Sequence, residues 1–514
     1  MDDRRLESLI HDTFNGRLSR RDVLRRAGTL GLSVPVVAAL LAACGSSNTA
    51  STPTASTGAA GTTGTPAATA VAGTPAASAA ATSAATTTPA ATPAASPSAS
   101  TGVAYTKDNP PSVANAAAAK QYSGQTITYY GDSVGIGHDL DVIVTGQFTK
   151  DTGINVKVIQ HPQSSTDTYA TYLRFFQAKS PDIDVMMLDV IWPGAFAPHL
   201  MDLSQAFASE KSQYYDTIIT NNTVNGKLVA IPWFGDFGML FYRTDLLQKY
   251  GFTSPPATWD DLENQARTIM TGEHGRNSNF WGFVFQGDAY EGLTCDALEW
   301  LASTGGGSII QNGQVTLNNP NAIQILNQAR SWVGTIAPRG VTSYLEEDAR
   351  NVFQGGNAAF MRNWPYAYAL ANSADSPVNG KVDVAPLPAS AGQPHVGTVG
   401  GWQLGVSAYS KVQAASIELV RYMASPEVES YRAQIGSFVP TIAAVAADPE
   451  VIKAEPFLQK LQSVTRVTRP SGETGANYNQ VSTYFFQGVN QILNGANASQ
   501  QVPQITQQIQ RVVG

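Results

Sequence analysis

The chain has few of the residues on which several kinds of protein chemistry depend. Only two cysteines and six histidines occur, and no histidines have His-x-x-x-His spacing, so we expect no metal site. No Gly-x-x-x-x-Gly-Lys loop is present, which excludes a P-loop nucleotide site, and we expect no other cofactor. With a net charge of -7, nothing in the composition indicates binding to nucleic acid or to an anionic membrane surface.

Charge is absent altogether from one long stretch. No Asp, Glu, Lys or Arg occurs from Cys44 through Thr106, where Ala, Thr, Ser, Pro and Gly dominate. Such small side chains cannot build a core, so we expect a disordered tether over 44–111, or alternatively a glycosylated stalk. A flexible chain of about 60 residues has a root-mean-square reach of roughly 40–45 Å.

The first residues resemble an export signal. Arg20 and Arg21 precede an apolar run from Leu30 to Leu41, which is shorter than the roughly 20 residues that span a bilayer. A basic start, a short apolar centre and small residues at its end predict an export signal over 1–43. The paired arginines resemble a twin-arginine signal, and the alternative is general secretion.

The sequence Leu41-Ala42-Ala43-Cys44 resembles a bacterial lipobox. In proteins with this motif the cysteine thiol is acylated, and two acyl chains hold a protein stably at a membrane. We therefore predict lipid attachment at Cys44, against the alternative of a buried or reactive thiol. Cys295 remains as a small buried hydrophobic residue.

After the tether, strand and helix patterns alternate. Strands are predicted at 126–130, 154–159 and 184–188, with helices at 141–150 and 168–178. This order predicts a mainly parallel sheet covered by helices. Ligands bind beyond the carboxyl ends of such strands, where Asp189, Trp192 and the loop around His138 stand.

A second unit of the same kind follows. It includes a strand at 239–242, a helix that Thr258 and Asp261 open as a capping box, and a helix at 319–333. A further strand is expected at 399–407, and amphipathic helices are expected at 414–424 and 484–493. No period typical of a solenoid repeats along the chain.

Longer motifs carry a resemblance. They are Asn279-Phe-Trp-Gly-Phe-Val-Phe-Gln-Gly287, Tyr290-Glu-Gly-Leu293, Gln354 to Tyr366, Val384-Ala-Pro-Leu-Pro388 and Gly400-Gly-Trp-Gln-Leu-Gly405. Over about 120–514 the chain resembles the extracellular solute-binding proteins of ABC sugar importers (family 1). It is most similar to their trehalose- and maltose-binding branch.

The resemblance implies a fold. Family members have a type II periplasmic-binding-protein-like α/β fold, with two lobes and a ligand cleft between them. We expect each lobe to be a mainly parallel sheet flanked by helices. The strands that cross between the lobes are expected near 230–233 and 403–406, with lobe I formed by 112–231 plus 407–450 and lobe II by 232–406 plus 451–514.

The resemblance also implies ligand contacts, carried over residue by residue: Asp189, Asp236, Trp364, Tyr366, Gly401, Trp402 and Arg469. Three positions depart from the family pattern. A family arginine falls on Thr171. A family tyrosine falls on Phe234, which has no hydroxyl but is still expected to contact the ligand. The acidic residue of the first loop falls within 137–139, and Asp139 is its candidate.

These residue types suit a sugar. A pyranose has an apolar face on which aromatic rings stack, and a rim of hydroxyls that charged groups hydrogen-bond. Two interpretations of Glu291 are equally compatible with the sequence: a ligand contact or a buried structural acid. Trp281, Trp300 and Trp332 are expected in the core.

The function implied is that of a substrate-binding lipoprotein, which delivers a trehalose- or maltose-type disaccharide to the permease of an ABC importer with a separate ATPase. We expect a monomer, held by lipid at the outer face of the bacterial cytoplasmic membrane, with no enzymatic activity. One alternative is a glycoside hydrolase with Asp189 and Asp236 as its carboxylate pair. Another is a receptor that reports sugar to a sensor.

Overall fold

The computed structural model describes residues 102–514. The predicted export signal, the lipobox at Cys44 and the tether up to residue 101 lie outside the described residues. Within 102–514, none of the helices combines the length and the apolar character needed to cross a membrane.

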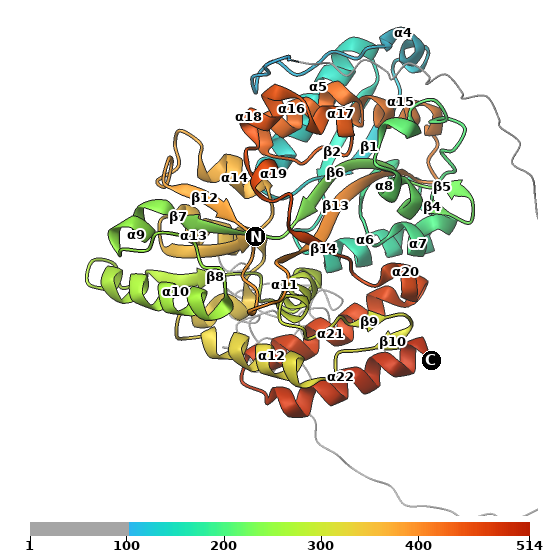
Figure 1. Ribbon diagram of the computed structural model, residues 1–514. Coiled ribbons are helices and arrows are strands. Elements are labelled where there is room, and N and C mark those ends of the chain that lie inside the picture. Colours follow the sequence, from blue (N-terminus) through green and yellow to red (C-terminus); the bar gives the residue numbers. More distant parts are fainter. Residues whose placement is uncertain (1–101) are drawn as a thin grey trace, which may run out of the picture. The chain divides into compact units, whose positions relative to one another are not determined.

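Lobe I is built around a six-stranded sheet (Figure 1). Its strand order is β14-β13-β3-β1-β2, with β6 also paired to β13. The strands are β1 (Thr126–Gly131), β2 (Asn155–Gln160), β3 (Val185–Asp189), β6 (Ile231–Phe237), β13 (Val396–Val406) and β14 (Thr465–Val467). Its principal helices are α5 (Gly137–Thr152), α6 (Ser165–Gln177), α15 (Gln413–Met423) and α16 (Pro426–Gly436).

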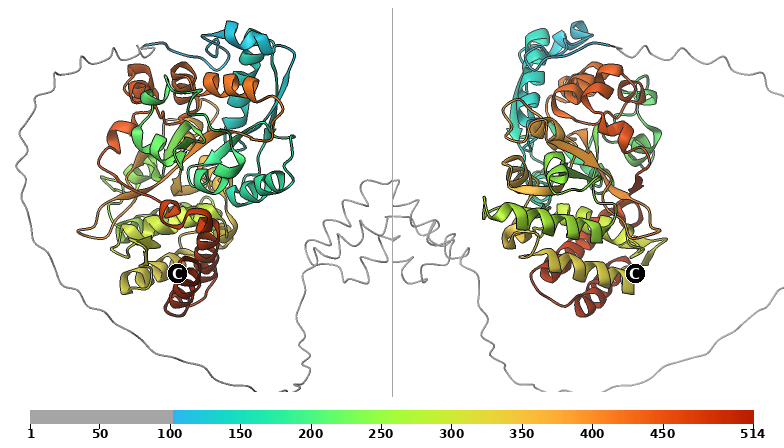
Figure 2. Two further views of the ribbon diagram at one scale, coloured as in Figure 1. Left: turned by 90° about the vertical axis from the view of Figure 1, so that its right-hand side faces the viewer. Right: turned by 60° about the vertical axis from the view of Figure 1, so that its left-hand side comes forward.

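Lobe II is built around a four-stranded sheet of order β12-β7-β11-β8. The strands are β7 (Met239–Arg243), β8 (Trp281–Val284), β11 (Ala358–Asn363) and β12 (Val382–Ala385). Its principal helices are α10 (Trp259–His274), α11 (Glu291–Ala302), α12 (Pro320–Trp332), α13 (Glu346–Gln354), α21 (Tyr478–Leu493) and α22 (Ala498–Val513). Figure 2 shows from two directions that α22 and the carboxyl terminus belong to this lobe.

Short elements complete the chain. The helices are α4 (Ala116–Ala119), α7 (Pro193–Phe196), α8 (Asp216–Asn221), α9 (Thr244–Lys249), α14 (Tyr366–Ala371), α17 (Ala443–Ala446), α18 (Pro449–Ala454), α19 (Phe457–Lys460) and α20 (Ser471–Thr474). Two short hairpins pair β4 (Thr223–Val224) with β5 (Lys227–Leu228) and β9 (Ile310–Gln311) with β10 (Gln314–Val315).

The two-lobed α/β architecture is confirmed, but the sheets are mixed rather than mainly parallel. In lobe I, β1 runs parallel to β2 and β3, whereas β13 runs antiparallel to β3 and β6. In lobe II, β7 runs antiparallel to both β11 and β12. The antiparallel partners include β6 and β13, whose direction is set by the path of the chain between the sheets.

The register of β13 determines which residues of β3 and β6 lie opposite its middle residues. Trp402 lies opposite Asp189 on β3 and opposite Phe234 on β6, and Gly400 lies opposite Asp236. All of β6 pairs within the first sheet and β7 begins in the second at Met239, so the chain changes sheet later than the expected boundary near 230–233.

The aromatic core of lobe II confirms two of three expected tryptophans. Trp300 and Trp332 are buried and pack edge to face, with ring centroids 5.6 Å apart. Trp281 is only half-buried and packs at the edge of this core.

Residues 102–111, expected to be the end of the tether, lie against lobe I. The backbone N–H of Tyr105 donates to Gln434 Oε1 at 2.9 Å, and the Tyr431 hydroxyl donates to the Lys107 carbonyl at 2.6 Å. The rings of Tyr105 and Tyr431 also pack edge to face at 5.7 Å. These contacts fix the segment, so the described body begins before the expected residue 112.

Candidate ligand-binding site

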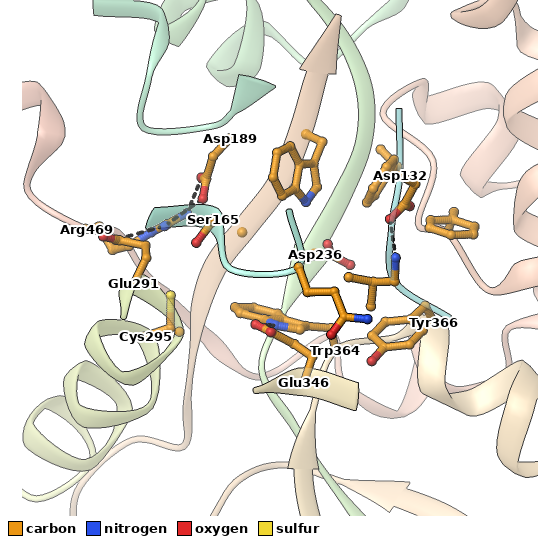
Figure 3. Close-up of a pocket in the computed structure, with 18 residues that line it drawn as sticks. Asp132, Ser165, Asp189, Asp236, Glu291, Cys295, Glu346, Trp364, Tyr366 and Arg469 are labelled. Atoms are coloured by element: carbon orange, nitrogen blue, oxygen red, sulfur yellow. Dashed lines mark hydrogen bonds and ion pairs between the residues drawn. The ribbon is translucent and has the colours of Figure 1, made fainter. Parts of the chain in front are cut away.

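A cavity lies between the two lobes (Figure 3). The space between its lining atoms is about 680 Å³, a volume that includes solvent at the open side of the cavity. The lining residues are Asp132, Val134, Gln163, Ser165, Asp189, Phe234, Asp236, Glu291, Gly292, Cys295, Glu346, Trp364, Tyr366, Gly400, Gly401, Trp402, Phe438 and Arg469.

Two half-buried indole rings bound the cavity. Trp364 lies between β11 and α14, and its Nε1 atom is 3.4 Å from Glu346 Oε1. Trp402 is stacked on the His161 ring, with centroids 4.9 Å apart and planes 18° apart. Trp192 meets Trp402 edge to face at 5.6 Å. His161 and Trp192 therefore hold the Trp402 ring from behind, while the ring itself lines the cavity.

Arg469 is paired with carboxylates of both lobes. Its Nη2 atom donates to Asp189 Oδ1 at 2.7 Å and its Nη1 atom donates to Asp189 Oδ2 at 3.1 Å. Nη1 also donates to Glu291 Oε1 at 3.0 Å. Because Asp189 ends β3 of lobe I and Glu291 begins α11 of lobe II, the guanidinium links the lobes at one end of the cavity.

Glu291 is held on every side. The Ser482 hydroxyl donates to its Oε2 atom at 2.7 Å, and the Tyr478 hydroxyl donates to its Oε1 atom. Its backbone N–H donates to Thr166 Oγ1 on α6 of lobe I at 3.1 Å. Burial raises the pKa of Glu291, and Arg469 opposes that shift. The side chain lines the cavity, but its oxygens already have partners within the protein.

The Asp236 carboxylate has a different environment. No hydrogen-bond donor among the described residues reaches it, although the residue is half-buried and lines the cavity. Burial, with a smaller contribution from the nearby Asp132 carboxylate, raises the pKa of Asp236 well above its ordinary value. A hydroxyl-bearing ligand would supply the donor that this carboxylate lacks.

Asp132 lies at the other end of the cavity, near a buried arginine. Arg432 Nη1 donates to Asp141 Oδ1 at 2.6 Å, and Arg432 Nη2 lies 3.9 Å from Asp132 Oδ2. The Arg432 guanidinium carbon is also 4.2 Å from the Phe438 ring centroid and 5.4 Å from that of Phe234. Burial raises the pKa of Asp132 despite this cation.

The structure brings eight of the nine proposed ligand contacts into the cavity lining; the exception is Asp139. Asp139 lies in the exposed first turn of α5, and its carboxylate is 3.1 Å from Lys107 Nζ. This placement corrects the expected first-loop contact. The helix begins at Gly137, earlier than expected, which carries Asp139 to the surface, and Asp132 is the acidic residue of that region in the cavity.

Tyr366 and Cys295 also line the cavity. Tyr366 is 5% exposed, and its hydroxyl donates to Glu347 Oε1 at 2.7 Å, so its ring is the part left for a ligand. Cys295 is buried, as expected, and burial raises its thiol pKa well above the ordinary value.

Comparison with known proteins shows the family to which the chain belongs. The model of the bacterial extracellular solute-binding proteins matches residues 130–430. The chain belongs to this family. A Deinococcus radiodurans protein described as a probable ABC transporter-binding protein is 48% identical over 386 residues, which cover 74% of this chain and 92% of that protein. The maltodextrin-binding protein MdxE of Bacillus subtilis is 25% identical over 289 residues, 54% of this chain and 64% of its own.

A solved structure extends the likeness. The maltose-bound MalE3 of T. maritima is 37% identical, covers 76% of this chain and 100% of its own, and superposes with a TM-score of 0.71. These relatives are binding proteins, so the prediction of a binding protein rather than an enzyme is confirmed, and the glycoside hydrolase alternative is set aside. Membership of an extracellular family also implies that this solute-binding protein is exported.

Some lining residues of this solute-binding protein were not predicted: Asp132, Val134, Gln163, Ser165, Gly292, Glu346, Gly400 and Phe438. Asp132 follows the last residue of β1, as Asp189 ends β3, and the two strands pair in parallel. The rule that selected Asp189 could therefore have found Asp132. Glu346 and Phe438 reach the cavity through tertiary packing, which no local pattern reports.

Gly401 has a conformational requirement. Its φ of +107° is unfavourable for any residue with a side chain, and a Cβ atom would lie 2.5 Å from the Phe234 carbonyl oxygen. The β13–β6 register shifts immediately afterwards, between Trp402 and Gln403. The glycine thus allows the close strand approach that places Trp402 at the cavity.

Proposed function

We propose that the protein binds an α-linked disaccharide, such as trehalose or maltose, between its lobes and delivers it to an ABC importer. The observation that carries this proposal is a single cavity with two half-buried indole rings, several carboxylates and one guanidinium. A pyranose needs both a ring to stack on and charged groups for its hydroxyls. The 37% identical T. maritima protein was solved with maltose, which supports a ligand of this class.

In this proposal, charged groups hydrogen-bond the sugar rim. Asp189, Asp236 and Asp132 accept from hydroxyls, and Arg469 donates. Hydrogen bonds with a charged partner contribute about 1.5–3 kcal/mol each, compared with roughly 0.5–1.5 kcal/mol for neutral pairs. Asp236 is the strongest candidate, because its carboxylate lacks a donor within the protein.

Aromatic and backbone groups contact the sugar faces. Trp364 and Trp402 serve as the two stacking platforms, and Tyr366 supplies a ring edge. Gly401 lets the ligand approach the β13 backbone, and Phe234 offers an apolar wall without a hydroxyl.

We further propose that the lobes move as units. The expected bounds are 112–231 plus 407–450 for lobe I and 232–406 plus 451–514 for lobe II. Because β6, β13 and β14 pair within the lobe I sheet, we extend lobe I to Phe237 and add Val396–Val406 and Thr465–Val467 to it. Closure about the connecting segments would enclose the sugar, as hinge motions do in proteins of this kind.

The place of the protein in transport follows from the sequence. We propose a monomer that is exported by a twin-arginine-like signal and anchored through Cys44 at the outer face of the cytoplasmic membrane. The tether then lets the body reach the permease subunits, whose ATPase is a separate chain.

Calorimetry with trehalose, maltose, sucrose, glucose and longer maltodextrins tests the proposal. We expect an α-linked disaccharide to bind most tightly, to reduce the radius of gyration in small-angle scattering, and to be recovered unchanged. Failure of every sugar in the panel to bind would overturn the proposed ligand class.

A further inference from the structure

A buried arginine lies behind one of the two indole rings that line the cavity. Arg362, on β11, is 1% exposed, and its guanidinium carbon is 3.9 Å from the centroid of the Trp364 ring. A cation over an indole face at this distance is attracted to the ring. Because Trp364 lines the cavity and Arg362 does not, the guanidinium covers a ring face that a ligand does not reach.

Two carboxylates on α11 hold this guanidinium. Glu299 accepts from Nε at 2.8 Å and from Nη2 at 2.7 Å, and Asp296 Oδ1 lies 3.0 Å from Nε. Asp296 and Glu299 are three residues apart, so they share one helix face. Gln286 Oε1 accepts from Nη1 at 3.1 Å. The guanidinium has no freedom to leave the Trp364 ring while these bonds persist.

The same cluster contacts the strand that carries Trp402. Glu299 Oε1 also accepts from the backbone N–H of Thr398 on β13 at 3.0 Å. A Cβ atom on Gly238 would lie 1.9 Å from that oxygen, so the cluster also requires a glycine where the chain enters lobe II. Arg362 is thereby fixed relative to α11, β11 and β13 together.

Stability alone is a weak reason for such a cluster. Replacing a buried ion pair by apolar side chains of similar volume is often neutral or stabilising. Lysine could supply the same charge, but only the planar guanidinium can stack on a ring while pairing with two carboxylates. The contact with Trp364 gives the cluster a role that depends on this shape.

We propose that Arg362 is a positioning residue for ligand binding: held by Asp296 and Glu299, it fixes the plane of the Trp364 ring against the cavity. The effect on affinity rests on the proposed sugar-binding function. The effect on the ring itself does not, because the contact exists without a ligand.

The first test is Arg362→Lys, with Arg243→Lys as the matched control. Arg243 is a mostly buried arginine on β7 of the same sheet, bonded twice to Asp245 at 2.7 Å, and does not line the cavity. We expect Arg362→Lys to weaken trehalose or maltose binding on the order of tenfold and Arg243→Lys to leave it unchanged.

A ligand-free readout separates the two proposals. The fluorescence of Trp364 is obtained as the difference between each protein and its Trp364→Phe counterpart. Acrylamide should quench this difference signal more strongly in Arg362→Lys than in the parent, because the ring is no longer held. If no sugar binds but quenching changes, the proposed ligand fails while the positioning role stands.

A double-mutant cycle decides whether Arg362 acts through the ring. In a Trp364→Ala background, Arg362→Lys should cost much less affinity than in the parent, because the route through the ring has been removed and only the contact of Glu299 with Thr398 on β13 remains. An equal loss in both backgrounds, or unchanged quenching and affinity, would overturn the proposal. If Arg362→Lys does not fold, Glu299→Gln is used instead in the titration, the quenching measurement and the double-mutant cycle. This change removes one of the carboxylate charges that hold Arg362, so the same results are expected.

Discussion

Replacing Trp364 by alanine should reduce sugar affinity much more than it reduces the stability of the fold. A Trp→Ala change at a fully packed site costs about 3–5 kcal/mol, a large part of the roughly 5–15 kcal/mol that holds a domain together. Trp364 is only half-buried and lines the cavity, so part of its surface has no protein contact to lose. Its contact with Arg362 contributes about 0.5–2 kcal/mol.

The affinity should fall further. An aromatic residue at the centre of a binding site contributes on the order of 2–4 kcal/mol, which corresponds to roughly 30- to 1,000-fold in dissociation constant. Trp364→Phe should lie between the wild type and the alanine variant, because it keeps a smaller ring face. The assay pairs thermal melting with sugar titration on the same preparation.

Trp281→Ala provides the control for this measurement. Trp281 is also half-buried in lobe II, on β8, but it lies outside the cavity lining and meets His274 edge to face at 6.4 Å. It should lower the melting temperature with wild-type affinity. A large drop in the melting temperature of Trp364→Ala with near-normal affinity would show that Trp364 is a core residue and would refute the reasoning.

Four further outcomes are expected. Asp189→Asn removes one of the carboxylate charges that hold Arg469 between the lobes, where a hydrogen bond to a charged partner contributes about 1.5–3 kcal/mol. The ligand-free radius of gyration in small-angle scattering should therefore increase, and an unchanged scattering curve would contradict this expectation. Gly401→Ala should abolish sugar binding in calorimetry and lower the melting temperature, because its Cβ atom would lie 2.5 Å from a carbonyl oxygen of the facing strand; normal binding would exclude this requirement. Asp139→Asn should change sugar affinity less than twofold, since its carboxylate faces the surface, and a tenfold loss would restore it to the site. Cys44→Ala should leave the membrane fraction or accumulate as uncleaved precursor, whereas Cys295→Ala stays membrane-bound; mature Cys44→Ala protein in the membrane would refute lipid attachment.

Local patterns were sufficient for most elements of the fold. The run at 184–188 is an apolar stretch of strand length, and β3 is buried throughout. Thr258 and Asp261 form the capping box that their spacing predicts. The start of α5 was misplaced because the residue before it, Ile136, offers no side-chain cap, so nothing in the sequence marks Gly137 as the first helical residue.

Contacts between segments distant in sequence explain why some cavity residues and strand directions could not be predicted from local patterns. The backbones of Gly235 and Val439 form an isolated antiparallel bridge, and this contact between distant segments accompanies the entry of Phe438 into the cavity. Asp132 could have been predicted from the sequence. Ligands bind beyond the carboxyl ends of parallel strands, and this rule applies to β1 as it does to its neighbour β3. The direction of β13 relative to β3 depends on how the chain returns from lobe II. Strand propensity does not indicate whether two strands will pair in parallel or antiparallel.

The several roles of β13 restrict where new ligand preferences can arise. Its first residues pair with β14, its later ones pair with β6 and β3, and its middle supplies Gly400, Gly401 and Trp402 to the cavity. A substitution there alters the shape of the scaffold and the recognition surface at once. Combinatorial libraries aimed at other sugars should therefore yield more functional clones when diversity is placed at Gln163, Ser165 and positions around them than when it is placed on β13.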